Sequence, residues 1–287
     1  PAAFAPYDLS RENHTRLLWI FEGFTSYYDD LMLLRSGVIT RNEYLKILGK
    51  QISSVMATPG RHKQSVAESS FDAWTRYYKQ DENSPNALIS YYTKGSLIAL
   101  GLDLTIRQAT AERFSLDDVM RCMWARFGRE FYTGKSHGIT ENGFAKLVLE
   151  TTGVDVSNEI ALWAYGTHDV PLKTLLQHQQ IDLDWKAAST KPSMDVRIRK
   201  QGEQIVLATV LENGAAHQAG LSAMDILVAI DGIRVDANSN TLETLLNRYA
   251  PGERITVHIF RRDELRVFDL TLAIPAQNEC VLTDLNT

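Results

Sequence analysis

The chain has 287 residues, of which 44% are hydrophobic and 23% are charged, values that are ordinary for a globular protein with room for two cores. Its net charge of −5 argues against a nucleic-acid or anionic-membrane partner, because such partners require a basic surface. No apolar run approaches the roughly 20 residues of a membrane span, so we expect no membrane partner. The compartment stays open between cytoplasm and periplasm. Cys122 and Cys280 lie far apart and predict neither a disulfide framework nor a metal motif.

The first predicted element is a helix from about residue 11 to residue 35, interrupted by a carboxylate at Glu22. The apolar positions that would share its buried face are Leu17, Phe21, Phe24, Tyr28 and Leu31. An ionised carboxylate among apolar residues is costly unless a cation, a metal or several donors meet it. Gly23 gives up about 1 kcal/mol of helix propensity relative to Ala, which indicates close packing or a ligand. The residue pattern alone also allows Glu22 to face solvent on an amphipathic helix.

The next segments, up to about residue 176, are also predicted to be helical. Thr40 to Glu43 is a capping box that opens a helix ending near Ala57, because hydroxyl and carboxylate satisfy each other's free amides. A long apolar helix is expected from about Ala87 to Ala109, and another from Leu116. We therefore expect residues 1–176 to form a helical domain.

After a polar connection, expected to be a linker at 177–191, the apolar period changes from helical to alternating. This pattern predicts a β domain at 192–275, followed by a loose polar tail at 276–287. Asp231-Gly232 is a tight-turn signal. The predicted strands are 204–211, 225–230, 255–261 and 265–272, with a short helix at 241–249.

The stretch from Leu18 to Tyr28, LWIFEGFTSYY, resembles the L-W-x-x-E-G-x-T-x-Y-Y signature of glycyl-aminopeptidase-like zinc metallopeptidases. These gluzincins have a thermolysin-like helical catalytic subdomain followed by a PDZ domain. The resemblance implies that Glu22 is a zinc ligand, completed by two histidines of an H-E-x-x-H helix whose Glu is the general base. None of the seven histidines here is followed by Glu, and no two are four residues apart. We interpret the chain as the C-terminal portion of such a peptidase.

A second stretch, Ser90 to Gly95, resembles the Y-x-K-G element of related aminopeptidases, whose Tyr hydroxyl donates to the oxyanion of the tetrahedral intermediate. By position this residue is Tyr92, with Tyr91 as the neighbouring alternative. A positioned donor of this kind contributes roughly 3–4 kcal/mol to transition-state stabilisation. Without the resemblance, a Tyr at the start of an apolar helix is more often part of the core.

The β domain resembles a PDZ domain of the bacterial protease-associated kind. The resemblance rests on Ala215–Leu221, similar to S-P-A-x-x-A-G-L, and on Asp225–Gly232, similar to G-D-x-I-x-x-I-D-G. It implies a groove for a peptide C-terminus, with the groove residues expected to be Met194, Asp195, Val196 and Leu245. Asp195 opposes an anionic terminus, so a packed spacer domain without a ligand is the alternative.

Two functional hypotheses follow. In the first, the chain is a fragment of a zinc aminopeptidase that removes small, Gly- or Ala-like N-terminal residues from peptides. The chain alone is then expected to be inactive and to hold no zinc, because one carboxylate is not a zinc site. In the second, it is a non-catalytic module that binds peptides or proteins through the PDZ domain. A partial catalytic domain exposes apolar surface, so self-association is also expected.

Overall fold

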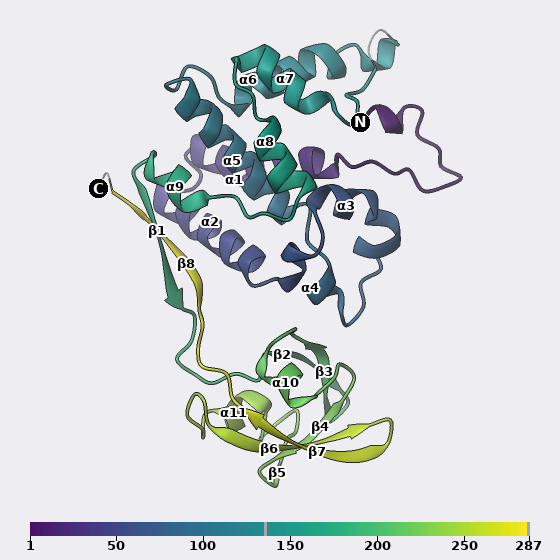
Figure 1. The fold of residues 1–287 in the computed structure, drawn as a ribbon, viewed down its shortest axis with the longest axis vertical. Coiled ribbons are helices and arrows are strands. Elements are labelled where there is room, and N and C mark those ends of the chain that lie inside the picture. The colour runs from purple at the N-terminus through teal and green to yellow at the C-terminus, as the bar shows by residue number, and fades with distance from the viewer. Residues whose placement is uncertain (135–136, 286–287) are drawn as a thin grey trace. The chain divides into compact units, whose positions relative to one another are not determined.

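The computed structural model describes residues 1–134 and 137–285, and the chain divides into two compact units (Figure 1). The helical unit contains the described residues of 1–79, 88–184 and 280–287. The sheet unit contains residues 80–87 and 185–279. The structure confirms the predicted fold class, a helical part followed by a β part.

The helical unit is built from α-helices joined by short 3-10 and π turns. None of the described helices combines the length and apolarity that a bilayer-spanning segment requires. The α-helices are α1 (Leu18–Arg35), α2 (Arg41–Met56), α3 (Val66–Phe71), α5 (Thr93–Ala109), α6 (Leu116–Met123), α7 (Gly143–Thr152), α8 (Ser157–Ile160) and α9 (Leu172–Gln177). The short turns are η1 (Ala2–Phe4), η2 (Pro59–His62), η3 (Ala73–Tyr77), η4 (Trp124–Gly128), η5 (Phe131–Thr133) and η6 (Ala161–Tyr165).

Helix α1 begins at Leu18, later than the predicted start near residue 11. The side chain of Asn13 explains the difference. Its amide group donates to the carbonyl of Asp8 (2.7 Å), and its oxygen accepts from the Asp8 amide (2.9 Å). Such local side-chain bonds hold the backbone in a loop and compete with helix formation.

Helix α2 starts as the sequence predicts. Thr40 Oγ1 accepts from the Glu43 amide at 3.2 Å, and Glu43 Oε2 accepts from the Thr40 amide at 2.8 Å. Two amides that the first turn leaves free are thereby satisfied, which is the purpose of a capping box. The prediction of this helix from Thr40 to about Ala57 is confirmed.

The long helix predicted from about residue 87 is broken in the structure. Residues 88–92 are not helical, and α5 begins at Thr93. Side chains replace the helical bonds of this segment: Gln64 Oε1 accepts from the Ile89 amide (3.1 Å), and Ser90 Oγ accepts from the Thr93 amide (3.1 Å). The irregular segment carries Tyr91 and Tyr92 to the start of α5.

The sheet unit is an antiparallel sheet in the order β2-β3-β4-β6-β7, with β5 paired to β4. Asp231 and Gly232 have φ values of 47° and 77°, so the predicted tight turn is confirmed. Asn86 belongs to this unit, because its amide donates to Val210 O (2.9 Å) and its oxygen accepts from the Glu212 amide (2.9 Å). The elements are α4 (Ser84–Ala87), β2 (Val196–Gln201), β3 (Gln204–Val210), α10 (Ala215–Ala219), β4 (Ile226–Ile230), β5 (Ile233–Arg234), α11 (Leu242–Leu246), β6 (Arg254–Arg261) and β7 (Glu264–Thr271).

The segments expected to be a linker and a loose tail contain strands instead. β1 (Ile181–Ala187) pairs with β8 (Gln277–Asp284) in a separate two-stranded sheet (Figure 1). Cys280 is buried, and its amide donates to Ser53 Oγ of α2 at 2.8 Å. The pairing joins segments about 90 residues apart, so neither segment carries a local signal for it. The last two residues of the expected tail, 286–287, lie outside the described residues.

Candidate active site

Glu22 lies in the middle of α1, where this helix crosses α5 at very short range. A Cβ atom added at Gly23 would lie 2.7 Å from backbone atoms of Gly95, and one added at Gly95 would lie 2.9 Å from Trp19 O. Only glycine at both positions allows this approach. The structure therefore assigns close packing, one of the two roles that the low helix propensity of Gly23 indicates.

The Glu22 side chain is half-buried at the edge of this crossing. Among the described residues, no hydrogen bond or ion pair engages its carboxylate. The hydroxyl of Tyr92 lies within reach of its charge: the pKa of Tyr92 is raised to about 12, mainly by burial, with the Tyr78 hydrogen bond and the Glu22 charge adding to the shift. Tyr92 therefore keeps its proton at neutral pH and can act as a donor.

Tyr92 belongs to a cluster of four tyrosines. The hydroxyl of Tyr91 donates to Tyr78 Oη at 3.0 Å, and Tyr78 Oη lies 3.1 Å from Tyr92 Oη. The Tyr91 and Tyr92 rings stack with centroids 4.7 Å apart, and Tyr77 packs on Tyr91 at the same distance. Tyr91 is fully buried, whereas Tyr92 is only partly buried, so of the two predicted candidates Tyr92 is the one open to a substrate.

The first turn of α5 is tied down by Lys94, two residues beyond Tyr92. Its ammonium group donates to Thr167 O (3.2 Å) and lies 3.7 Å from Asp169 Oδ1. Burial lowers the pKa of Lys94, and the Asp169 carboxylate acts against that shift. Arg61 also donates to Asp169, at 3.2 Å, so a buried polar network fixes the backbone that presents Tyr92.

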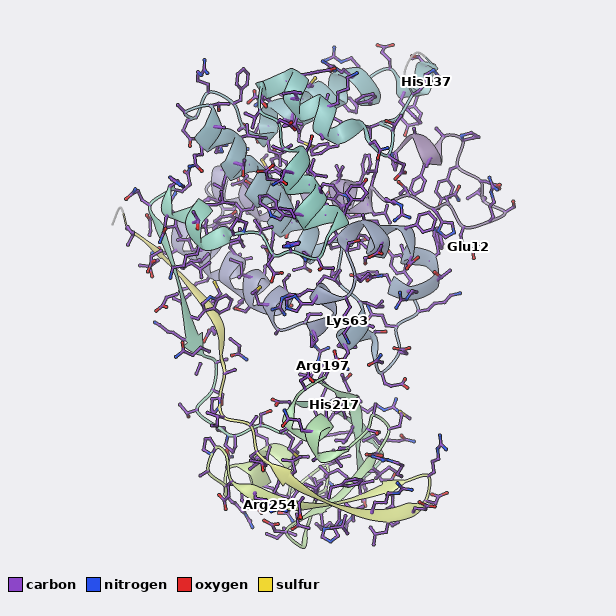
Figure 2. All side chains as sticks on the ribbon, in the orientation of Figure 1. Glu12, Lys63, His137, Arg197, His217 and Arg254 are labelled. Atoms are coloured by element: carbon purple, nitrogen blue, oxygen red, sulfur yellow. The ribbon has the colours of Figure 1, made fainter. Side chains whose placement is uncertain are left out.

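The residues present fit a metal ion only in part. A half-exposed carboxylate with no polar partner among the described residues can serve as one ligand, since zinc accepts carboxylate oxygen. No group of three or more His, Cys, Asp and Glu side chains in the described part of the chain is arranged to hold a metal. His137 and His217 lie exposed on the surfaces of their respective units (Figure 2).

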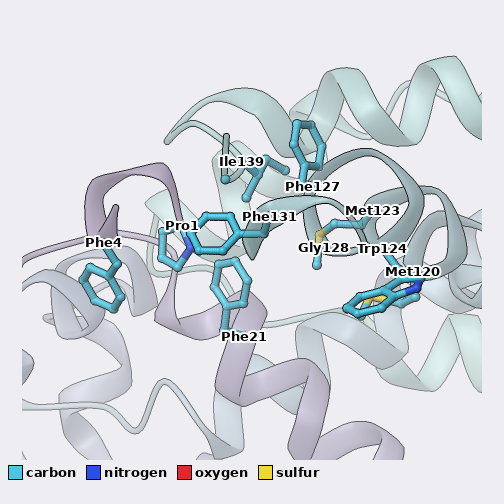
Figure 3. Close-up of a pocket in the computed structure, with 11 residues that line it drawn as sticks. Pro1, Phe4, Phe21, Met120, Met123, Trp124, Phe127, Gly128, Phe131 and Ile139 are labelled. Carbon is cyan, nitrogen blue, oxygen red and sulfur yellow. The ribbon is translucent and has the colours of Figure 1, made fainter. Parts of the chain in front are cut away.

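An apolar pocket of about 440 Å³ begins at Phe21, the residue before Glu22 on α1 (Figure 3). None of the described residues that line it has a charged side chain, so its side chains offer apolar contact. Its lining comes from the first residues of the chain, from α1, α6, η4 and η5, and from Gly138 and Ile139.

The sheet unit has its own groove, of about 280 Å³, between β2 and α11. Met194 and Val196 line it, as predicted for groove residues, together with Ile198 and Leu242. Asp195 does not line it: its carboxylate accepts from the Ala215 amide at 3.0 Å. Leu245 is 1% exposed and belongs to the core of the unit.

The structure places the charge of Glu22 within reach of Tyr92 in the helical unit, and the groove residues belong to the sheet unit. Tyr78 is a member of the tyrosine cluster that the sequence reading missed. It follows the π turn η3 and has no motif of its own, so only its position in space identifies it.

Comparisons with known proteins agree with this arrangement. Residues 1–98 match the family model of the M61 glycyl aminopeptidases, and residues 192–272 match that of the PDZ domain. The crystal structure of an aminopeptidase N family protein from Idiomarina loihiensis is 35% identical, with a TM-score of 0.88, over 99% of this chain and 49% of that chain. The present chain therefore spans about half the length of that relative.

More distant structures add little. The HtrA-type protease AlgW with a decapeptide is 18% identical over 30% of each chain, with a TM-score of 0.26. A variant of AlgW, also with a decapeptide, is 16% identical over 37% of this chain and 33% of its own, with a TM-score of 0.27. Scores this low carry no argument, and no curated protein sequence matches the chain. The relationship rests on the other matches: residues 1–98 are similar to the M61 glycyl aminopeptidases, and residues 192–272 match the PDZ domain.

Proposed function

We propose that the chain is the C-terminal portion of a zinc-dependent aminopeptidase that removes small, Gly- or Ala-like N-terminal residues from peptides. The observation that carries the proposal is the placement of Glu22, a half-exposed carboxylate with no polar partner in the described structure, beside the protonated hydroxyl of Tyr92. The family match of residues 1–98 supports it, because both residues fall within that range.

In this proposal Glu22 holds the zinc as one of its ligands, and the bound metal supplies Lewis-acid polarisation and an activated water. Tyr92 supplies a hydrogen bond to the carbonyl oxygen of the scissile peptide, where negative charge develops. Its raised pKa keeps the proton in place throughout the neutral and mildly alkaline range. The Lys94 network and the Gly23–Gly95 contact fix the position of this donor relative to Glu22, so little reorganisation is needed.

The isolated 287-residue chain is inactive under this proposal. The histidine ligands and the general base of the family motif do not occur in its sequence, and one carboxylate cannot hold catalytic zinc alone. Activity has to be measured on the longer protein that contains this chain.

The test is hydrolysis of alanyl-p-nitroanilide by that longer protein. Removing one oxyanion donor costs about 100- to 1,000-fold in kcat, so we expect a loss of this size for Tyr92→Phe with little change in KM. Tyr132→Phe is the matched control, because Tyr132 is 96% exposed. A Tyr92→Phe enzyme with the kcat of the wild type would refute the assigned role of Tyr92.

We also propose that the PDZ groove binds an extended peptide. The supporting observation is the apolar part of its lining, which includes Val196 and Ile198 of β2, an edge strand of the described sheet to which an extended peptide can add. The Asp195 carboxylate accepts from the Ala215 amide and does not line the groove.

This binding function is tested by fluorescence titration with a labelled peptide that ends in Val-Leu-Val, as free acid and as amide. Ile198 is 41% exposed in the groove, and Ile198→Asp is expected to weaken binding at least about 10-fold by placing a charge on the apolar contact. Val267→Asp is the control, on an exposed residue of β7 that does not line the groove. Equal affinities of the two variants would count against the groove.

A further inference from the structure

We propose that Tyr78 is a positioning residue for the proposed reaction. In this role Tyr78 donates a hydrogen bond to Tyr92 while Tyr92 donates to the substrate oxyanion. The inference rests on the proposed role of Tyr92. It assigns a role to a residue outside both sequence motifs, and it starts from the contacts of three hydroxyl groups.

Two hydrogen bonds link the three hydroxyls, and Tyr78 takes part in both. Tyr91 Oη lies 3.0 Å from Tyr78 Oη and Tyr78 Oη lies 3.1 Å from Tyr92 Oη, both within hydrogen-bond range. Tyr91 is the donor in the first bond. Tyr91 is fully buried and Tyr78 is largely exposed, so this bond is partly buried.

Counting protons gives the direction of the second bond during the reaction. Each phenol has a single proton to donate. When Tyr92 gives its proton to an oxyanion, its contact with Tyr78 persists only if Tyr78 is the donor. The result is a head-to-tail chain from Tyr91 through Tyr78 to Tyr92, and chains of this kind strengthen the final donor because the bonds polarise one another.

The surrounding aromatic rings hold these three hydroxyl groups in place. Tyr77 packs on Tyr91 and Tyr78, with ring centroids 4.7 and 5.5 Å apart, and its own hydroxyl lies 3.0 Å from Ser90 Oγ, outside the chain. Tyr78 is 62% exposed, so its hydroxyl contributes little to the core. Tyr78→Phe therefore removes the bond and keeps the ring, and Tyr132→Phe, at a 96% exposed position outside the cluster, is the control.

The first measurement is steady-state kinetics on the longer protein that contains this chain. Loss of one hydrogen bond that acts through Tyr92 is expected to lower kcat roughly 3- to 10-fold in Tyr78→Phe, with KM unchanged. Tyr132→Phe is expected to keep the kcat of the wild type. An unchanged kcat in Tyr78→Phe, or an equal loss in both variants, would overturn the inference.

The second measurement uses the 287-residue chain without metal or substrate. With tyrosine labelled at ¹³Cζ, the Tyr92 resonance is identified by its loss in Tyr92→Phe. It is expected to shift in Tyr78→Phe and to stay in place in Tyr132→Phe. A Tyr92 resonance that does not move in Tyr78→Phe overturns the inference even if kcat falls. Absence of peptidase activity in the wild type would instead refute the proposed function, while the spectrum still decides the coupling.

Discussion

Two carboxylates in the helical unit differ in the number of hydrogen bonds that they accept. Asp103 of α5 is buried and fully engaged: Tyr27 Oη and Arg107 Nε donate to Oδ2 (2.9 and 3.0 Å), and the Leu116 amide donates to Oδ1 (2.7 Å). Glu22 has no such partner among the described residues. A carboxylate with this many donors is a structural element, whereas one left open beside a protonated tyrosine is available for a ligand.

The pKa of Tyr44 predicts how the stability of the fold depends on pH. Burial, together with the charges of Asp30 and Asp103, raises the pKa of Tyr44 from 10.0 to about 12. Above pH 10 the unfolded chain therefore loses this proton before the folded chain does. The folded state then holds more protons than the unfolded state. The contribution of Tyr44 to the free energy of unfolding therefore falls as pH rises from 10 toward 12, by up to about 1.4 kcal/mol per pH unit.

Tyr44→Phe removes this dependence. We expect the unfolding free energy of the variant to improve relative to the wild type between pH 10 and pH 12, measured by urea titration. The difference between the two proteins at pH 7 and pH 9, where Tyr44 keeps its proton in both states, sets the baseline. A difference that stays constant from pH 7 to pH 12 would contradict the assignment.

Sequence reasoning located Glu22 and Tyr92 because each lies in a short contiguous pattern. Gly23 stood out for its low helix propensity, although only the structure identifies Gly95 as the reason. Tyr78 could not be found, since its hydroxyl partners lie 13 and 14 residues away across an irregular segment. Contacts of this kind leave no periodic trace in a single sequence.

Among the secondary-structure elements, the crossing of α1 and α5 decides the geometry of the site. The two helices touch through glycine backbones, which sets the distance between Glu22 and the Tyr92 segment. Tyr27 reinforces the contact by donating to Asp103, one turn beyond Gly23 on α1 and about two turns beyond Gly95 on α5. Any atom inserted between Gly23 and Gly95 has to separate the helices.

Gly23→Ala tests this contact. Overpacking against backbone atoms, which cannot rotate away, costs about 3 kcal/mol at the upper end of the usual range. The helix propensity of Ala returns about 1 kcal/mol, so we expect a net loss of about 2 kcal/mol by urea unfolding. Ser54→Ala, at an exposed position of α2, is expected to change stability by less than about 0.5 kcal/mol. Stability equal to the wild type in Gly23→Ala would rule out the close contact.

Elements with strong local signals were predictable, and those that depend on distant partners were not. The capping box at Thr40 and the turn at Asp231-Gly232 are examples of the first kind. Strands β1 and β8 are examples of the second, because they pair with each other and β8 also bonds to α2. The irregular segment before α5 depends at Ile89 on the side chain of Gln64, which comes from another part of the chain.

At the scale of the whole molecule, each unit matches a family with its own chemistry. Residues 1–98 contain both Glu22 and Tyr92, and residues 192–272 contain the groove between β2 and α11. The chain spans about half of its aminopeptidase N family relative, so the remaining zinc ligands and the base are proposed to come from the rest of the protein. The central claim is that Glu22 supplies one ligand to that site.

Zinc content tests this claim most directly. After extensive gel filtration, the longer protein that contains this chain is expected to hold one zinc per chain by mass spectrometry of the metal, and Glu22→Ala is expected to lose it. Glu12→Ala, on an exposed carboxylate near the start of the chain, is expected to keep the metal. Glu22→Ala protein with a full complement of zinc at unchanged affinity would contradict the account.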